Sequence, residues 1–366
     1  MYDKNMGISV YLGIKSLDED IKYIKMAHKY GFTKIFTCFL GLNEENKNSY
    51  LESLSLFMNI ATNLNFKVYV DVNPYVLKLL NITYEDLSFF KNLNIYGIRL
   101  DEGFSGLEES AMSFQSNLKI MINASNGTKY LDNIISYKPN MSNLEACHNF
   151  YPRKYSGLSL NHFLQTSQDI KNYGLSVGAF VNSQNSDTFS NQEIMEGLPS
   201  LEHHRNIPLV NQAKELYYCR LINDVMIGNA YASESEFKQL YNLDKNLITL
   251  DAQLEDNLES FYTDMLLNNL HTNRGDVSDF IIRSTMLRIK YKNTYIPPFN
   301  TKNIQAGDIT IDNENYKKYK GELHIARAPM INDGNVNVIG KINQYDLGLL
   351  NYIKPWSKFN FNLINK

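Results

Sequence analysis

The 366-residue chain lacks several features by which whole classes of protein are recognised. Its three cysteines, Cys38, Cys147 and Cys219, are far apart and form no C-x-x-C motif, so we expect neither a disulfide framework nor a thiolate zinc site. The formal net charge of −3 argues against a nucleic-acid-binding protein, which normally carries a basic excess. No apolar run approaches the roughly 18 residues of a membrane-spanning helix. The composition therefore predicts no nucleic acid and no membrane among its partners.

The N-terminus also lacks the pattern of a secretory signal peptide. A short apolar run from Gly7 to Gly13 is followed by Lys15 and three acidic residues rather than by a small-residue cleavage site. Together with the sparse cysteines, this predicts a cytoplasmic protein. Hydrophobic residues make up 43% of the chain, which is enough for a core and excludes a largely disordered protein.

The first two thirds of the chain alternate between short apolar runs and longer amphipathic stretches. The apolar runs, rich in β-branched and aromatic residues, predict strands at 8–12, 34–39, 67–72, 96–101, 118–123, 144–149, 176–181 and 224–228. Apolar residues spaced by three and four predict helices at 17–30, 44–63, 159–173 and 209–220. Eight strand–helix units in about 235 residues predict a (β/α)8 TIM barrel. The alternative is an open doubly wound sheet, which we disfavour because no G-x-G-x-x-G follows the first strand.

The pattern changes after about Tyr241. Apolar and polar residues alternate at 248–254, as in a strand with one solvated face. Further short runs lie at 280–289, 309–311, 321–326 and 336–342, separated by turn-rich stretches. We therefore expect two domains: a catalytic (β/α)8 barrel at 1–241 and a smaller, mostly β domain at 242–366.

Chemistry in such a barrel is expected where the strands end, at its C-terminal rim. Strand ends and the long loop at about 182–206 bring carboxylates, histidines, an amide and arginines to this rim: Asp71, Asp101, His148, Asn149, Arg153, Glu196, Glu202, His204 and Arg205. Asp224 begins its strand, so we expect it at the opposite end in a structural role. Plainer explanations stay open, because an aspartate ending a strand is often a helix cap and His148 or Arg205 can simply be hydrogen-bonded or ion-paired.

Several chemistries find no support. The chain has no H-E-x-x-H, no H-x-H after the first strand and no G-x-x-x-x-G-K-[ST], so we expect no metal and no cofactor. No lysine is well placed for a Schiff base within the barrel. The remaining possibility is acid–base chemistry by a pair of carboxylates, with cationic residues nearby to hold the substrate. The standard use of such a pair is hydrolysis of a glycosidic bond.

Ordered motifs along both halves resemble one known family. They include GISVY at 7–11, IRLDEGFS at 98–105, CHNFYPR at 147–153 and EGLPSLE at 196–202 with His204-Arg205. Others lie at 227–230, 274–276 with 282–285, 307–313 and 319–323. The chain thereby resembles the 6-phospho-N-acetylmuramidase family, glycoside hydrolase family 170. One departure is Lys317-Lys318, where the family pattern has Gly-Arg, and it bears on an anion contact.

The resemblance implies a TIM barrel followed by a cyclophilin-like β domain. It also implies hydrolysis of the β-1,4 bond in a disaccharide of N-acetylmuramic acid 6-phosphate and N-acetylglucosamine, a step in cytoplasmic peptidoglycan recycling. This substrate carries a phosphate and a carboxylate, which suit a rim with Arg153, His204 and Arg205.

Within this reading, Asp101 and Glu196 are the first candidates for the catalytic pair, with Asp71 and Glu202 in reserve. The expected substrate-binding residues are His148, Asn149, Arg153, His204, Arg205, Asn229, Asp308 and Asn313. The last two belong to the second domain, where they either close over the pocket or stabilise a turn. Two other functions use the same rim: a sugar-phosphate lyase or epimerase, and a non-catalytic sugar-phosphate-binding protein.

Overall fold

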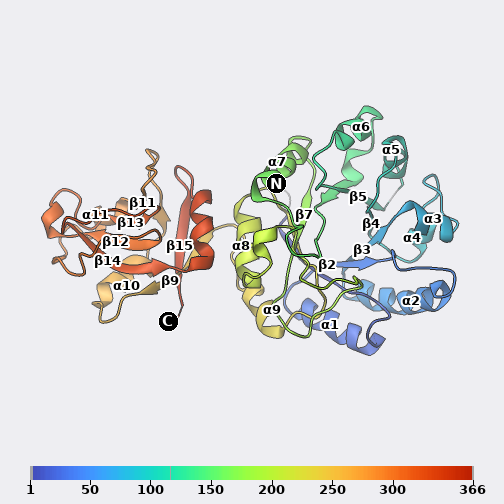
Figure 1. Cartoon of the computed structure of the whole chain (residues 1–366), viewed down its shortest axis with the longest axis horizontal. Coiled ribbons are helices and arrows are strands. Elements are labelled where there is room, and N and C mark those ends of the chain that lie inside the picture. Colours follow the sequence, from blue (N-terminus) through green and yellow to red (C-terminus); the bar gives the residue numbers. More distant parts are fainter. Residues whose placement is uncertain (1–2, 116, 365–366) are drawn as a thin grey trace. The chain divides into compact units, whose positions relative to one another are not determined.

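The computed structural model describes residues 3–115 and 117–364, and the chain divides into two compact units, Met1–Leu243 and Asp244–Lys366. The first unit is coloured blue to yellow in Figure 1 and the second orange to red. Among the described residues, no helix is long and apolar enough to cross a membrane. Each unit has its own sheet and its own buried core.

The first unit is a closed barrel of eight parallel strands in sequential order, sealed by pairing of the first strand with the eighth. The strands are β1 (Asn5–Ser9), β2 (Lys34–Cys38), β3 (Lys67–Val72), β4 (Gly97–Leu100), β5 (Lys119–Asn123), β6 (Leu144–Cys147), β7 (Val177–Val181) and β8 (Asp224–Ile227). This confirms the predicted (β/α)8 barrel and excludes the open sheet. The first strand lies three residues earlier than predicted. Val10 and Tyr11 are buried like strand residues, which explains the prediction, but they lie beyond the paired part of the strand.

Helices surround this barrel (Figure 1). They are α1 (Leu17–Lys29), α2 (Lys47–Asn63), α3 (Pro74–Leu79), α4 (Ser88–Asn92), α5 (Leu107–Ser113), α6 (Tyr130–Ser136), α7 (Leu160–Asn172), α8 (Leu209–Tyr218) and α9 (Glu234–Tyr241). Helix α1 shows why they begin where they do, since the Ser16 and Glu19 side chains form a capping box. Its buried Ile24 and Ala27 lie three residues apart and face the barrel.

A buried charge cluster fills the end of the barrel where the strands begin. The Lys34 ammonium lies 2.6 Å from an Asp224 carboxylate oxygen and 3.8 Å from Glu145. Asn5 donates to the other Asp224 oxygen at 2.8 Å. Burial lowers the pKa of Lys34, but Asp224 and Glu145 more than reverse this, so the net shift is upward. The structural role expected for Asp224 thus has a geometric basis.

The barrel interior above this cluster is packed with aromatic rings. Phe36 and Phe180 come from β2 and β7, and their ring centroids lie 5.2 Å apart. Phe150, from the segment after β6, packs edge-on against Phe180 at 5.1 Å. A barrel of this size is filled by side chains rather than open as a pore. Chemistry is thereby restricted to the rim at the strand ends.

The second unit is a seven-stranded sheet in the order β10-β15-β9-β14-β12-β13-β11. Its strands are β9 (Ile248–Leu254), β10 (His271–Thr272), β11 (Ile281–Ser284), β12 (Asp308–Asp312), β13 (Leu323–Ala326), β14 (Val336–Ile342) and β15 (Lys358–Leu363). Helices α10 (Ser260–Leu267) and α11 (Met286–Lys290) accompany it. A second, mostly β domain is therefore confirmed. The run predicted at 280–289 is divided, because its first part forms β11 and its second part α11.

The buried ion pair in the barrel floor generates a stability prediction. Exchange of Asp224 to Asn leaves the Lys34 ammonium buried without its nearest carboxylate, and we expect a loss of about 3–5 kcal/mol. Urea unfolding followed by circular dichroism measures the loss. The control is Glu234→Gln, which breaks the exposed Lys29–Glu234 pair and should leave the transition where it was. Equal shifts in both variants would contradict the buried-pair argument.

Candidate functional site

Arg99, from β4, is the centre of a polar cluster at the C-terminal ends of the strands. Its Nη1 lies 2.6 Å from Asp71 of β3 and 3.4 Å from Asp101, which directly follows β4. Its Nη2 donates to the Asn149 side-chain oxygen. The Arg99 side chain is only 3% exposed, whereas that of Asp101 is 35% exposed. The cluster thus combines a buried cation with one carboxylate that is open to solvent.

The two carboxylates of this cluster differ in their surroundings. Burial raises the pKa of Asp71 to about 6; Arg99 opposes this shift, and the nearby Asp101 adds to it. A carboxyl group with such a pKa exists in both protonation states near neutral pH, as a general acid requires. Asp71 is therefore the rim carboxylate best suited to carry a proton.

Arg99 was missing from the residues expected at the rim. It lies inside an apolar run, where an arginine suggests no role by itself. The strand register could have indicated Arg99. Arg99 pairs directly with Asp71 across β3 and β4, and it is separated from Asp101 by an even number of positions along the chain. Residues of one parity along a strand face the same side of the barrel.

His148 and Asn149 follow β6 and lie in different environments. Asn149 reaches Arg99 and is held in place by its backbone, whose N–H donates to the Ser125 hydroxyl and whose carbonyl accepts from Ser200, both at 2.8 Å. His148 is fully buried and lies 2.8 Å from the Ser167 hydroxyl. Burial lowers the pKa of His148 to about 3, so it is neutral. The interior hydrogen-bonded histidine considered above fits this geometry.

Glu202 and Arg205 form a clamp between two loops. Arg205 is buried, and two of its nitrogens contact Glu202 at 2.6 and 2.8 Å. Its remaining N–H groups donate to the main-chain carbonyls of Tyr151, Arg153, Glu196 and Gly197. Glu202 also accepts from two backbone N–H groups in the segment after β6. The donors of Arg205 are therefore all used within the protein.

The electrostatics of the two loop glutamates differ from those of Asp71. The Arg205 guanidinium, with two backbone N–H donors, lowers the pKa of Glu202 to about 2 despite partial burial. Glu196 is exposed and accepts from the Lys154 backbone N–H at 2.9 Å, which lowers its pKa. Neither is poised to donate a proton. The hydrogen bonds thus group Asp101 with Asp71, and place Glu196 and Glu202 with the loop clamp.

His204 belongs to a triad beside this clamp. Within the described part of the chain, His203, His204 and Glu215 form the one group whose metal-ligating atoms lie close enough for an ion, within 4.8 Å of one another. Both imidazole Nε2 atoms already lie 2.6 and 2.7 Å from the same Glu215 oxygen. These hydrogen bonds hold the pKa of Glu215 well below its usual value although burial opposes them. The triad is explained as a link between the long loop and α8.

The other predicted binding residues occupy varied positions. Asn229 is buried and exchanges two hydrogen bonds with the Ser183 backbone, at 2.8 and 2.9 Å. Arg153 is exposed, and its guanidinium has no hydrogen bond or ion pair with a described residue. Of the three cations expected to hold an anion, Arg153 is therefore the one available to do so.

Asp308 and Asn313 lie in the second unit, where both stabilise turns. An Asp308 oxygen accepts from the Gln305 backbone at 2.8 Å. The Asn313 oxygen accepts from the Asn315 backbone at 3.0 Å, and its amide donates to Asn337 at 2.8 Å. This is the Asx-turn role that the sequence left open. A direct contact of either residue with substrate stays a prediction.

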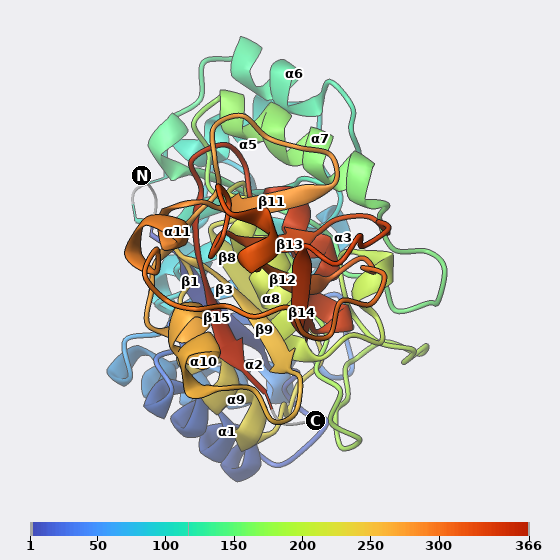
Figure 2. The same ribbon diagram turned by 90° about the vertical axis from the view of Figure 1, so that its left-hand side faces the viewer.

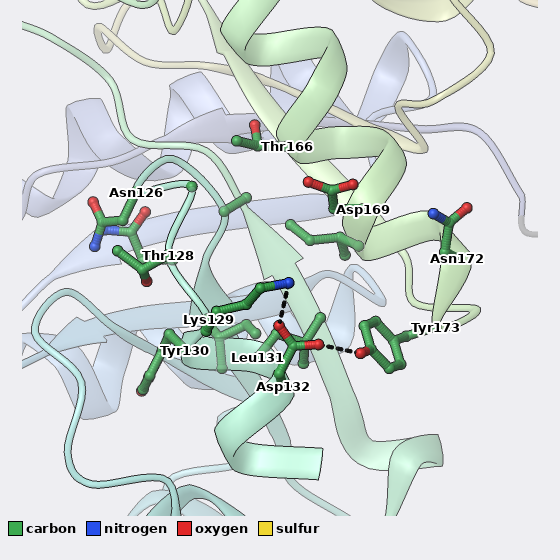
Figure 3. Close-up of a pocket in the computed structure, with 15 residues that line it drawn as sticks. Asn126, Thr128, Lys129, Tyr130, Leu131, Asp132, Thr166, Asp169, Asn172 and Tyr173 are labelled. Atoms are coloured by element: carbon green, nitrogen blue, oxygen red, sulfur yellow. Dashed lines mark hydrogen bonds and ion pairs between the residues drawn. The ribbon is translucent and has the colours of Figure 1, made fainter. Parts of the chain in front are cut away.

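A cavity of about 420 Å³ lies elsewhere on the barrel, between α6 and α7. Figure 3 shows Lys129 and Tyr173 both directed at Asp132, which lies 3.2 Å from the Lys129 ammonium. Asp132 therefore has its partners within the protein. None of the predicted site residues lines this cavity. We assign the candidate site to the Arg99 cluster, where the titratable groups converge.

Comparison with known proteins identifies relatives along the whole chain. Two family models match, one described as 6-phospho-N-acetylmuramidase, N-terminal, over residues 6–242, and one as its C-terminal counterpart over 248–362. No curated protein matches the chain.

Two solved structures are similar over nearly their full length. An uncharacterized B. cereus protein is 38% identical, with a TM-score of 0.91, and the match covers 98% of this chain and 99% of that one. A conserved Enterococcus faecalis protein of unknown function is 28% identical, with a TM-score of 0.73, covering 99% and 96%. On the two family models, which together span both units, the chain belongs to the 6-phospho-N-acetylmuramidase family.

Proposed function

We propose that the protein is a glycosidase that hydrolyses the β-1,4 bond between N-acetylmuramic acid 6-phosphate and N-acetylglucosamine. Membership of the family supports a glycosidase. The observation that carries the mechanism is the pairing of Asp71 and Asp101 on one Arg99 nitrogen at the barrel rim. We place the reaction in the cytoplasm, in the recovery of cell-wall sugars.

In this mechanism Asp101 and Asp71 have different tasks. Asp101 is partly open to solvent, so its carboxylate can attack the anomeric carbon of the muramic acid residue. Asp71, with its pKa near 6, protonates the oxygen of the departing N-acetylglucosamine. Asp71 then removes a proton from the water that releases the second sugar. Asn149 and Arg99 keep the two carboxylates in place throughout.

The spacing of the two carboxylates favours retention of configuration. Because both contact the same Arg99 nitrogen, at 2.6 and 3.4 Å, their nearest oxygens lie no more than about 6 Å apart. Retaining glycosidases hold their carboxyl groups about 5–5.5 Å apart, whereas inverting enzymes need roughly 6.5–9.5 Å to admit a water molecule. The Asp71–Asp101 spacing is therefore closer to the retaining arrangement.

The substrate's anionic groups need a cation that is not already occupied. Arg205 and His204 are engaged with Glu202 and Glu215, so we assign them to positioning of the long loop. Arg153 lies in the segment that this clamp holds, and its guanidinium is available for the phosphate or the carboxylate. This assignment changes the expected role of Arg205 and His204 from direct to indirect.

Incubation with the phosphorylated disaccharide tests the function itself. We expect two products, N-acetylmuramic acid 6-phosphate and N-acetylglucosamine, identified by mass spectrometry. The matched control is the same disaccharide without phosphate, which we expect to react more slowly because the anion contact is lost. One altered sugar would indicate a lyase or epimerase, and binding without turnover would indicate a carrier; either result would refute the glycosidase.

Carboxylate exchanges test the assignment of the pair. Asp101→Asn and Asp71→Asn should each lower kcat/KM by roughly a hundredfold to ten-thousandfold, because each removes an acid, base or nucleophile. Glu102→Gln changes an exposed neighbouring carboxylate and serves as the control with near-normal activity. Thermal unfolding verifies that each variant is folded. An active Asp71→Asn beside an inactive Glu196→Gln would return the second role to Glu196.

The stereochemical outcome gives an independent test. Retention releases the β-anomer of N-acetylmuramic acid 6-phosphate first, before mutarotation produces the α-anomer. Proton NMR during the first minutes of a reaction at high enzyme concentration distinguishes the two. Initial appearance of the α-anomer would exclude Asp71 and Asp101 as a retaining pair.

A further inference from the structure

The second unit contains a cavity of about 410 Å³, lined by both polar and apolar side chains, that none of the assignments above uses. Three of its lining side chains lie in a row across adjacent strands, since Arg283 of β11 and Thr310 of β12 both pair with His324 of β13. Figure 2 shows these strands side by side. Side chains paired in this way project from the same face of the sheet, so the row forms a polar floor.

One oxygen of a buried carboxylate at this cavity lacks a hydrogen-bond partner. Asp312, at the end of β12, is 3% exposed and lines the cavity. Its Oδ1 has no hydrogen-bond partner among the described residues, and its other oxygen lies 3.8 Å from His324. Buried polar atoms are nearly always hydrogen-bonded, and an exception calls for an explanation. After a small rotation of the side chain toward the cavity, a ligand hydroxyl or amide would supply the missing donor.

The wall of the cavity supplies aromatic rings and cationic donors. Tyr316 and Tyr319 line it, with ring centroids 5.7 Å apart. Arg283 donates its Nε to the buried Glu322 at 2.7 Å, and no described hydrogen bond uses its two Nη groups. Rings of this kind provide a flat apolar surface for a saccharide, and a guanidinium edge provides donors for an anion.

A cationic shelf adjoins the same cavity across Tyr319. A hollow of about 330 Å³ is lined by Arg288, Ile289, Lys292, Lys317, Lys318 and Lys320. Arg288 lies 3.3 Å from Glu322 and Lys320 lies 2.9 Å from Glu314, so the other lysines supply its free charge. The Arg288 guanidinium lies 5.7 Å and the Lys318 ammonium 6.0 Å from the centroid of the Tyr319 ring. Tyr319 therefore separates a pocket suited to a polar ring from a surface suited to a negative charge.

We propose that the second unit has its own binding site for an anionic sugar, with the ring in the Asp312 cavity and the phosphate or carboxylate toward the cationic shelf. The Tyr319 ring packs against the sugar, Asp312 accepts from a sugar hydroxyl, and the Arg283 Nη groups with Lys317 and Lys318 neutralise the anion. This site does not depend on the proposed hydrolysis. It would bind such a sugar even if the barrel catalysed another reaction.

A local probe allows this site to be tested in the full-length protein. Met330 lines the cavity, so its signal in a [methyl-13C]methionine NMR spectrum, assigned with Met330→Leu, reports binding there. The probes are N-acetylglucosamine 6-phosphate, N-acetylglucosamine and inorganic phosphate. We expect the phosphorylated sugar to shift the signal at the lowest concentration. No shift with any probe, or an equal response to phosphate alone, would overturn the proposal.

Two variants assign the contacts. Tyr319→Ala should weaken binding of the phosphorylated sugar about tenfold. Tyr345→Ala is the matched control, because Tyr345 is 39% exposed and Tyr319 37% and Tyr345 lies outside the cavity. The double exchange Lys317→Gln/Lys318→Gln lies on the exposed shelf and should remove the preference for the phosphorylated over the neutral sugar. Unchanged binding in this folded double variant and in Tyr319→Ala would refute the site, whatever the hydrolysis assay shows.

Discussion

The rim of the barrel depends on how the Arg99 charge is compensated. A guanidinium that is 3% exposed is costly to bury unless carboxylates and hydrogen-bond acceptors surround it. Asp71, Asp101 and Asn149 supply these acceptors from three separate segments, so the charge fixes their relative positions. The same cluster raises the pKa of Asp71, because its burial outweighs the attraction of a guanidinium that is shared with Asp101. The arrangement of these rim residues and the proposed acid–base chemistry therefore both follow from the burial of the Arg99 cluster.

The fold could be predicted where buried segments are recognisable as apolar runs in the sequence. Strands covered on both faces read as continuous apolar runs, which is why all eight barrel strands could be located. In the second unit β15 (Lys358–Leu363) was not predicted, although its six residues alternate between polar and apolar as those of β9 do. The run at 280–289 shows the same limit: tertiary packing, not local pattern, ends β11 at Ser284 and starts α11 two residues later.

Of the site residues, only those at or just after the ends of predicted strands could be predicted from the sequence. Asp71, Asp101 and Asn149 were located because each ends a strand or follows one closely, and parallel strands bring their ends to one rim. An ion pair of Arg205 was considered from the sequence, and Glu202 provides it. Its main-chain acceptors lay beyond this reasoning, since they come from another loop and no residue type indicates them. Arg99 was missed for a different reason. A cation inside an apolar run does not by itself indicate that strand pairing will place a carboxylate beside it.

The charged groups of this protein fall into two classes. Some have their hydrogen-bonding capacity filled within the protein, and others have capacity left for a ligand. Lys34 lies 2.6 Å from Asp224, and every donor of Arg205 is used within the protein, and such groups hold strands and loops in place. Asp101 is 35% exposed and 3.4 Å from its cation, and the Asp312 Oδ1 has no partner among the described residues. An unsatisfied buried polar group costs free energy that a ligand can recover, and this applies to Asp312. Asp101 is instead open to solvent, so a substrate can reach it directly.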